Sequence, residues 1–126
     1  ASIPVIANGD VSDYESFEWL LTQTRCDGVM VSRASVGKPW LFHSIGLQQN
    51  NSPTHFPDDQ QQADLLLTHV RELVRVDGEV KALLQARKLV AYYFPTVTLN
   101  DEQRESVNAL AVISDLEAVV ASLLNR

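Results

Sequence analysis

The chain has 126 residues, of which 45% are hydrophobic and 21% are charged, a composition typical of a small folded protein rather than a disordered one. Its formal net charge of −6 argues against a dedicated nucleic-acid-binding domain, because such domains usually carry a basic surface. Any contact with RNA would therefore depend on a local basic patch.

The first predicted unit consists of a strand, a turn and a helix. Ile3–Ala7 is an apolar strand candidate. Ser12 and Glu15 have the Ser-x-x-Glu spacing of a capping box, which predicts a helix that runs to about Thr24. The opening residues therefore predict one βα unit.

A second unit of the same kind follows. Val29–Val31 is a short apolar run, and Pro39 is expected in the first turn of a helix that carries Trp40 to Ile45. Strands that alternate with helices form parallel sheets, and strands that are apolar on both faces are typical of the interior of such sheets. We therefore expect residues 1–47 to form two βα units of a parallel sheet that needs further strands.

The middle of the chain is polar and is interrupted by Pro53 and Pro57, which predicts a linker at residues 48–59. Residues 60–126 are expected to be helical throughout. The predicted fold class is therefore an α/β segment followed by an all-α helical bundle, in a chain that is mostly helical.

Four helices are expected in the second half. The first ends near Gly78, a C-cap candidate, and the second stops before Pro95. Asn100 and Ser114 are N-cap candidates for the last two, and a Glu three residues after Ser114 completes a capping box. Short connections predict an antiparallel bundle. The positions expected on its inner face are Leu66, Val70, Leu73 and Val74 in the first helix, and Val80, Leu84, Arg87, Ala91 and Phe94 in the second.

Polar residues follow both predicted strands. In (β/α)8 barrels the loops after strands carry the site, and the loops after the last two strands frequently bind phosphate. Asn8-Gly9-Asp10 and Ser32-Arg33 hold such positions, where Gly9 would let the backbone approach an anion and Arg33 would add charge and a fork of donors. The alternative is that the first stretch is only a turn before a helix and Arg33 is a surface cation.

Three stretches together resemble a known family. "IPVIANGD", "DGVMVSRASVGKPWLF" and the helical "QARKLVAYYF" resemble the C-terminal part of the tRNA-dihydrouridine synthases, and the resemblance covers nearly the whole chain. The aspartate of Asn8-Gly9-Asp10 and the Gly37-Lys38-Pro39-Trp40 step distinguish this family from other flavin-phosphate barrels. The resemblance implies an FMN-dependent oxidoreductase that uses NADPH to reduce a uridine of tRNA, with a barrel domain for the flavin and a helical domain that helps to hold the tRNA.

The same resemblance implies that residues 1–47 are the last two βα units of a TIM barrel, whose general form has about 250 residues. The family's catalytic cysteine and its flavin-contacting lysine lie upstream of the matching part. No catalytic residue is therefore expected in this chain, and Cys26 is expected to be a buried, inert thiol. We expect a C-terminal fragment that is inactive alone and binds little or no FMN.

Matched residue by residue, the resemblance assigns Asn8, Gly9, Asp10 and Arg33 to the phosphate region of FMN. Ser32 departs from the glycine that the family usually has before this arginine. Its side chain would crowd the phosphate if that backbone needs a positive φ, and would be free to donate its hydroxyl if it does not.

The basic pair of the family's helical domain is matched by Arg87 and Lys88, and the resemblance implies that they meet tRNA phosphates as positioning contacts. Arg71 and Arg75, one helical turn apart, are expected to extend that face. The alternative is that all four are solvated cations, paired with nearby acids such as Glu72.

The remaining chemically distinctive residues predict structure more than function. The three histidines lack the spacing of metal ligands and have no cysteine partners, so no metal site is expected. Trp19 and Trp40 are expected to fill the core or a domain interface. Tyr92 to Phe94 would pack within the bundle or, as an alternative, stack on RNA bases.

Two functions from different classes remain open. The first is a part of a flavin-dependent tRNA-modifying reductase, and the second is a stand-alone, non-enzymatic helical module that binds RNA or protein. The free strand edges of residues 1–47 invite self-association. No apolar run approaches the ~18 residues of a membrane span, no signal-peptide pattern is present, and a single cysteine allows no internal disulfide. These features predict a cytoplasmic protein without membrane contact.

Overall fold

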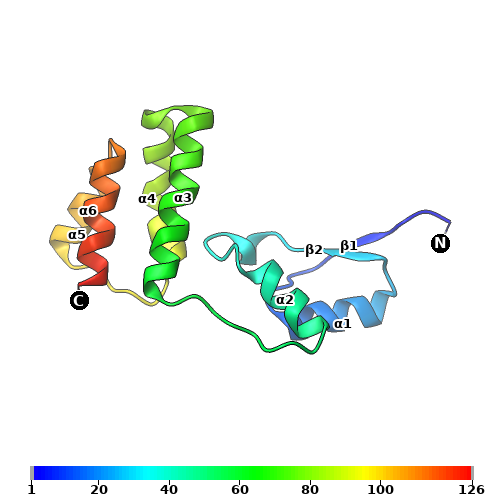
Figure 1. Ribbon diagram of the computed structural model, residues 1–126. Helices are drawn as coiled ribbons and strands as arrows, with labels where there is room; N and C mark the ends of the chain where they lie inside the picture. Colours follow the sequence, from blue (N-terminus) through cyan, green and yellow to red (C-terminus); the bar gives the residue numbers. More distant parts are fainter. Residues whose placement is uncertain (1, 126) are drawn as a thin grey trace. The chain divides into compact units, whose positions relative to one another are not determined.

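The computed structural model describes residues 2–125, and the chain divides into two compact units between Phe56 and Pro57 (Figure 1). The predicted fold class is confirmed, because two βα units are followed by a helical bundle. The first unit contains β1 (Ile6–Asn8), α1 (Tyr14–Thr24), β2 (Gly28–Met30), the short 3-10 helix η1 (Arg33–Ser35) and α2 (Leu41–Gln49). The second contains α3 (Asp59–Asp77), α4 (Glu79–Tyr93), α5 (Asp101–Asn108) and α6 (Ile113–Leu124).

The sheet of the first unit pairs β1 and β2 in parallel, as predicted, with Ile6 opposite Gly28 and Asn8 opposite Met30. Before the strands, the backbone N–H of Asp27 donates to the carbonyl of Val5, and the N–H of Val5 donates to the Asp27 carboxylate. Both strands are displaced from their predicted positions, β1 toward the C-terminus and β2 by one residue toward the N-terminus.

The sequence predicted that both strands would be buried on both faces, but in the structure they are not. The side chains of Ile3, Val5, Ile6 and Met30 are all exposed. Within the described residues the sheet has two strands, so each has a free edge and an incompletely covered face. The apolar pattern of the strands therefore predicted that their side chains are buried, whereas the described residues leave several of them exposed.

The core of the first unit lies between the sheet and its two α-helices. Val11, Leu20, Leu41 and Ile45 are buried there, and Val29 packs against them. Trp19, which was expected in a core or an interface, lies on the exposed side of α1. Its neighbour Leu20 takes the inward position because adjacent helical residues are about 100° apart.

Capping residues fix where helices begin, and two differ from the prediction. Helix α1 is capped by Asp13 and not Ser12, because the Asp13 carboxylate accepts from the backbone N–H and the hydroxyl of Ser16. These hydrogen bonds lower the pKa of the Asp13 carboxyl. Helix α6 begins at Ile113, one residue before the predicted cap Ser114.

The bundle follows the predicted element order. Helices α3 and α4 form an antiparallel pair joined at Gly78, whose φ of 85° suits glycine (Figure 1). The predicted ends at Gly78 and before Pro95 are confirmed, as is the Asn100 cap of α5, whose side chain accepts from the N–H of Gln103. No helix within residues 2–125 combines the length and apolar character needed to cross a membrane.

The apolar face of α4 is displaced by one residue from the prediction. Leu84, expected on the inner face, is 51% exposed, and Val80 is also exposed. Leu83 has no exposed surface. Both stripes have helical periodicity, so the pattern alone does not choose between them. The fully or nearly fully buried residues of the bundle include Ala63, Leu66, Val70, Ala82, Leu83, Ala86, Val90, Tyr93, Leu110, Leu116, Val120 and Leu123.

Candidate functional site

The main candidate site is a cavity of about 560 Å³ at the carboxyl ends of β1 and β2. Because the strands are parallel, both chain segments leave the sheet at the same edge. All five residues predicted from the ends of the strands are brought together here. The lining residues are Asn8, Gly9, Asp10, Val11, Ser12, Ser32, Arg33 and Ala34.

An ion pair spans this cavity. The Arg33 guanidinium donates to the Asp10 carboxylate at 2.7 Å, although the side chains are 89% and 87% exposed. Asp10 has a φ of 49°, so the turn that carries this carboxylate is left-handed. An exposed pair of this kind adds at most about 1 kcal/mol to stability. The contact places the Arg33 guanidinium beside the loop that follows β1.

The backbone angle at Ser32 bears on its departure from the glycine that the family usually has. Its φ is −118°, so this position does not require the positive φ that favours glycine. A side chain at this position therefore does not meet the steric conflict that a positive φ would create. At Gly9 an added Cβ would lie 3.9 Å from the Leu20 side chain, which is an ordinary contact.

Several side chains of the cavity can donate hydrogen bonds to an anion. Arg33 offers a planar fork of N–H groups, and Ser12 and Ser32 offer hydroxyls. The Asp10 carboxylate pairs with Arg33, so the two charges cancel and the lining would hold an anion mainly through hydrogen bonds. Sequence reasoning missed Ser12, Val11 and Ala34 as lining residues. Their position directly after the strand-end loops was the signal that could have identified them.

The two basic residues on α4 differ in their contacts, since Arg87 is hydrogen-bonded within the bundle and Lys88 is exposed. Arg87 is partly buried, and its guanidinium donates to the backbone carbonyl of Leu110 at 3.2 Å. Its Nε atom is buried and has no hydrogen-bond partner among the described residues. Lys88, the next residue, is exposed. The two side chains therefore point in different directions from α4.

The two arginines on α3 both contact acids. Arg71 forms an ion pair with Glu117 of α6 at 3.5 Å, and Arg75 pairs with Glu72 at 2.8 Å. All four side chains are more than half exposed or nearly so, so the pairs contribute little stability. They do reduce the positive charge that α3 presents to a partner.

The aromatic run at the end of α4 is divided between core and surface. Tyr93 and Phe94 are buried, and the Tyr93 hydroxyl lies 3.1 Å from Nδ1 of His69. Burial raises the pKa of the Tyr93 hydroxyl. Tyr92 is 52% exposed. Only Tyr92 of the three is available to a partner.

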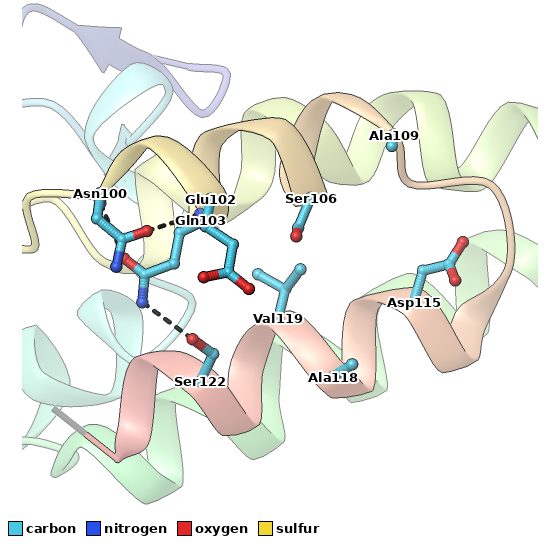
Figure 2. Close-up of a pocket in the computed structure, with 9 residues that line it drawn as sticks. All are labelled: Asn100, Glu102, Gln103, Ser106, Ala109, Asp115, Ala118, Val119 and Ser122. Carbon is cyan, nitrogen blue, oxygen red and sulfur yellow. Dashed lines mark hydrogen bonds between the residues drawn. The ribbon is translucent and has the colours of Figure 1, made fainter.

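A second cavity, of about 440 Å³, lies between α5 and α6 and was not predicted (Figure 2). Gln103 donates to the Ser122 hydroxyl at 3.0 Å across this groove, as Figure 2 shows. The Asp115 carboxylate is occupied by the backbone N–H groups of Ala111 and Val112. The described residues that line the groove include no Lys or Arg, and several of them have small side chains. It shares no residue with the strand-end cavity.

In the described part of the chain, no group of three or more His, Cys, Asp or Glu residues is placed to hold a metal ion. Cys26, expected to be buried, is a free and only partly buried thiol just before β2. The strand direction therefore puts it at the edge of the sheet opposite the strand-end cavity.

Comparisons with known proteins identify relatives over nearly the whole chain. The family model described as "Dihydrouridine synthase (Dus)" matches residues 1–125. The chain is 36% identical over 110 residues to tRNA-dihydrouridine synthase B of Pasteurella multocida, covering 86% of this chain and 33% of that protein. It is 37% identical over 126 residues to tRNA-dihydrouridine synthase B of Escherichia coli strain K12, covering 98% of this chain and 39% of that protein. The chain thus spans between a third and two fifths of the length of these curated relatives.

Proposed function

We propose, because this chain belongs to the dihydrouridine synthase family, that it forms the C-terminal part of an enzyme that reduces uridine in tRNA to dihydrouridine. The observation that carries the proposal is the family match over residues 1–125. The enzyme is an oxidoreductase that uses FMN and takes its reducing equivalents from NADPH. It acts in the cytoplasm on folded tRNA.

The strand-end cavity is the proposed site for the phosphate region of FMN. Arg33 supplies the positive charge, Ser32 supplies a hydroxyl, and the Asn8-Gly9-Asp10 loop supplies backbone N–H groups. Asp10 positions the Arg33 guanidinium. When bound, FMN supplies the ring that carries hydride between NADPH and uridine. Residues of this chain hold the cofactor, and no catalytic residue is proposed among them.

The exposed apolar strands support the view that the remainder of a barrel covers this sheet. Ile6 and Met30 project from paired strands into solvent, and each strand has an unpaired edge. A sheet of this kind gains stability when further strands bury its faces. The chain supplies one wall of the proposed cofactor site, so it is expected to be inactive alone.

The first prediction tests whether the longer protein is active and this chain alone is inactive. The longer protein that contains this chain is expected to convert uridine to dihydrouridine in unmodified tRNA when given FMN and NADPH. The chain of 126 residues alone is expected to form none and to purify without flavin absorbance. Mass spectrometry of digested tRNA, which detects two added hydrogens, measures the reaction. Dihydrouridine formed by the short chain, or none formed by the longer protein, would contradict the proposal.

A second prediction concerns the free edges of the sheet. Amide hydrogen exchange of the short chain is expected to be slow in α3 and α4 and fast at Val5–Ala7, because few described residues cover that strand. Self-association through these edges should slow exchange at Val5–Ala7 as protein concentration rises, without changing α3. Exchange in β1 that is as slow as in α3 at every concentration would argue against an incomplete sheet.

The second candidate function is a non-enzymatic helical module that binds RNA or protein. It is favoured by one observation, the separate and fully buried core of the bundle. The same experiment separates the two functions. A helical module predicts no dihydrouridine from any protein that contains this chain, whereas a reductase predicts dihydrouridine from the longer protein.

A further inference from the structure

Asp10 and Arg33 are each other's partners beside the strand-end cavity. One N–H of the Arg33 guanidinium donates to a carboxylate oxygen of Asp10 at 2.7 Å. Neither side chain forms another hydrogen bond or ion pair among residues 2–125. Asp10 belongs to the loop after β1 and Arg33 begins η1 after β2, so the contact joins the two loops that line the cavity. The guanidinium that is proposed to meet a phosphate therefore already has a carboxylate as its partner.

The lining of the cavity carries no excess of positive charge. Arg33 is the one cation and Asp10 the one acid among the described residues that line it. A phosphate monoester carries about 1.5 to 2 negative charges near neutral pH. Because a guanidinium group is only a few ångströms wide, a phosphate that accepts hydrogen bonds from Arg33 lies close to the Asp10 carboxylate as well. Like charges at such a separation repel each other.

Two arrangements are open to Arg33 when it meets a phosphate. A guanidinium has several N–H donors, of which the described contact with Asp10 uses one. In the first arrangement Arg33 binds the phosphate and keeps Asp10, so the phosphate and the carboxylate repel each other. In the second, Arg33 leaves Asp10 and the ion pair is lost. Both arrangements cost binding free energy, so the Asp10 carboxylate is unfavourable to a phosphate in either case.

The opposite effect, in which Asp10 helps by holding Arg33 in place, is weak. The two side chains are 89% and 87% exposed, and solvent screens an ion pair with this exposure. Such a pair restrains a long arginine side chain only slightly. A phosphate with nearly two charges meets the repulsion of the carboxylate with each of them. We therefore expect the repulsion to exceed the benefit of ordering Arg33.

The backbone at this turn accepts a residue without charge. Asp10 has a φ of 49°, in the left-handed region, where asparagine is tolerated as well as aspartate. Asparagine has nearly the same shape as aspartate and lacks its negative charge. The conformation of the turn therefore does not require the carboxylate, and the effect of its charge can be measured separately from the backbone.

We propose that the Asp10 side chain competes with a phosphate group for Arg33 and thereby weakens binding of the phosphate-bearing cofactor. The inference rests on the proposed function, which puts the phosphate region of FMN in the strand-end cavity, and it assigns to that site a contact that limits its affinity. The contact that positions Arg33 is also the one that the phosphate shares or displaces. The backbone N–H groups of the loop favour the phosphate, whereas the carboxylate of the same loop opposes it.

The test is a flavin fluorescence titration of the longer enzyme, freed of flavin, at low salt. Asp10→Asn is expected to bind FMN about three- to tenfold more tightly than the unaltered enzyme, the size of one close charge interaction in water. The gain should shrink as the salt concentration rises, because salt screens exposed charges. Riboflavin, which lacks the phosphate, is expected to bind both proteins equally within about twofold.

Two further variants make the result specific. Asp10→Gly also removes the carboxylate and suits the left-handed backbone, so it is expected to show the same gain even if Asp10→Asn is unstable. Glu15→Gln is the matched control, because it removes one negative charge from an exposed residue in the first turn of α1 that is not among the described lining residues of the cavity. Its affinity for FMN should stay within about twofold of that of the unaltered enzyme.

The results distinguish the inference from the proposed function. Unchanged or weaker FMN binding by Asp10→Asn and Asp10→Gly overturns the inference, as does an equal gain in Glu15→Gln or an equal gain for riboflavin. None of these outcomes affects whether the longer protein forms dihydrouridine. Conversely, a longer protein that shows the expected gain but forms no dihydrouridine would contradict the proposed reaction and leave the role of Asp10 in place.

Discussion

Replacing Leu83 with alanine is expected to lower the free energy of unfolding of the helical bundle by about 3 kcal/mol. Leu83 has no exposed surface and lies on the inner face of α4. Removal of its side chain loses buried apolar area and leaves a cavity that the surrounding helices can only partly fill. A loss of this size is a large fraction of the 5–15 kcal/mol that is typical of a folded domain.

The adjacent Leu84 gives a matched control for this substitution. Leu84→Ala removes the same atoms from a side chain that is 51% exposed, and it is expected to cost about 0.5 kcal/mol or less. Urea unfolding followed by circular dichroism reports the helices. Fluorescence of Trp19 and Trp40 reports the first unit alone and should not change between variants. Equal destabilisation by the two substitutions would contradict the observed face of α4.

Replacing Arg33 with alanine is expected to weaken binding of FMN to the longer enzyme by about 10- to 100-fold. Among residues 2–125, Arg33 is the one cation that lines the strand-end cavity, and a hydrogen bond to a charged group contributes about 1.5–3 kcal/mol. Its removal also leaves the Asp10 carboxylate unpaired beside the proposed phosphate. Arg33→Lys should recover part of the affinity, because it restores the charge without the planar fork.

The control for Arg33 removes a charge near the amino-terminal end of β2, opposite the end that carries the cavity. Arg25 caps α1 before β2, with a φ of 52° that asparagine tolerates, so Arg25→Asn changes the charge equally without straining the backbone. Flavin fluorescence titration is expected to give an unchanged dissociation constant for Arg25→Asn. A similar loss in both variants would indicate a general charge effect and not a contact at the strand-end cavity.

The strand-end cavity illustrates how much of a site the sequence can predict. Asn8 to Asp10 and Ser32 to Arg33 were identified from their position after apolar runs, and the structure brings them together because the two strands are parallel. The contact between Arg33 and Asp10 joins residues 23 positions apart, so no local pattern predicted it. The sequence likewise left open whether Ser32 has a positive φ, and the structure shows that it does not.

Local signals determined most element boundaries. The end of α1 at Thr24, the cap at Asn100 and the break at Gly78 were correctly predicted, because capping and chain reversal depend on atoms only a few residues apart. The Asp13 cap was missed because Ser12 offered an equally good local pattern. Which of two neighbouring polar residues caps a helix depends on the backbone angles that the preceding turn imposes.

The sequence by itself determined that this protein has two βα units and a bundle of helices. It also carried the family resemblance, in a few residues at the strand ends and in one helix. Only the tertiary structure decided which stripe of α4 is buried, because Leu83 and Leu84 are equally apolar and the choice depends on the helices packed against them. It also decided which cations are free. The partner of Arg87 is the carbonyl of Leu110, 23 residues away, while Lys81 and Lys88 face solvent. Contacts between distant segments form only when the whole bundle packs, so no short-range pattern can encode them.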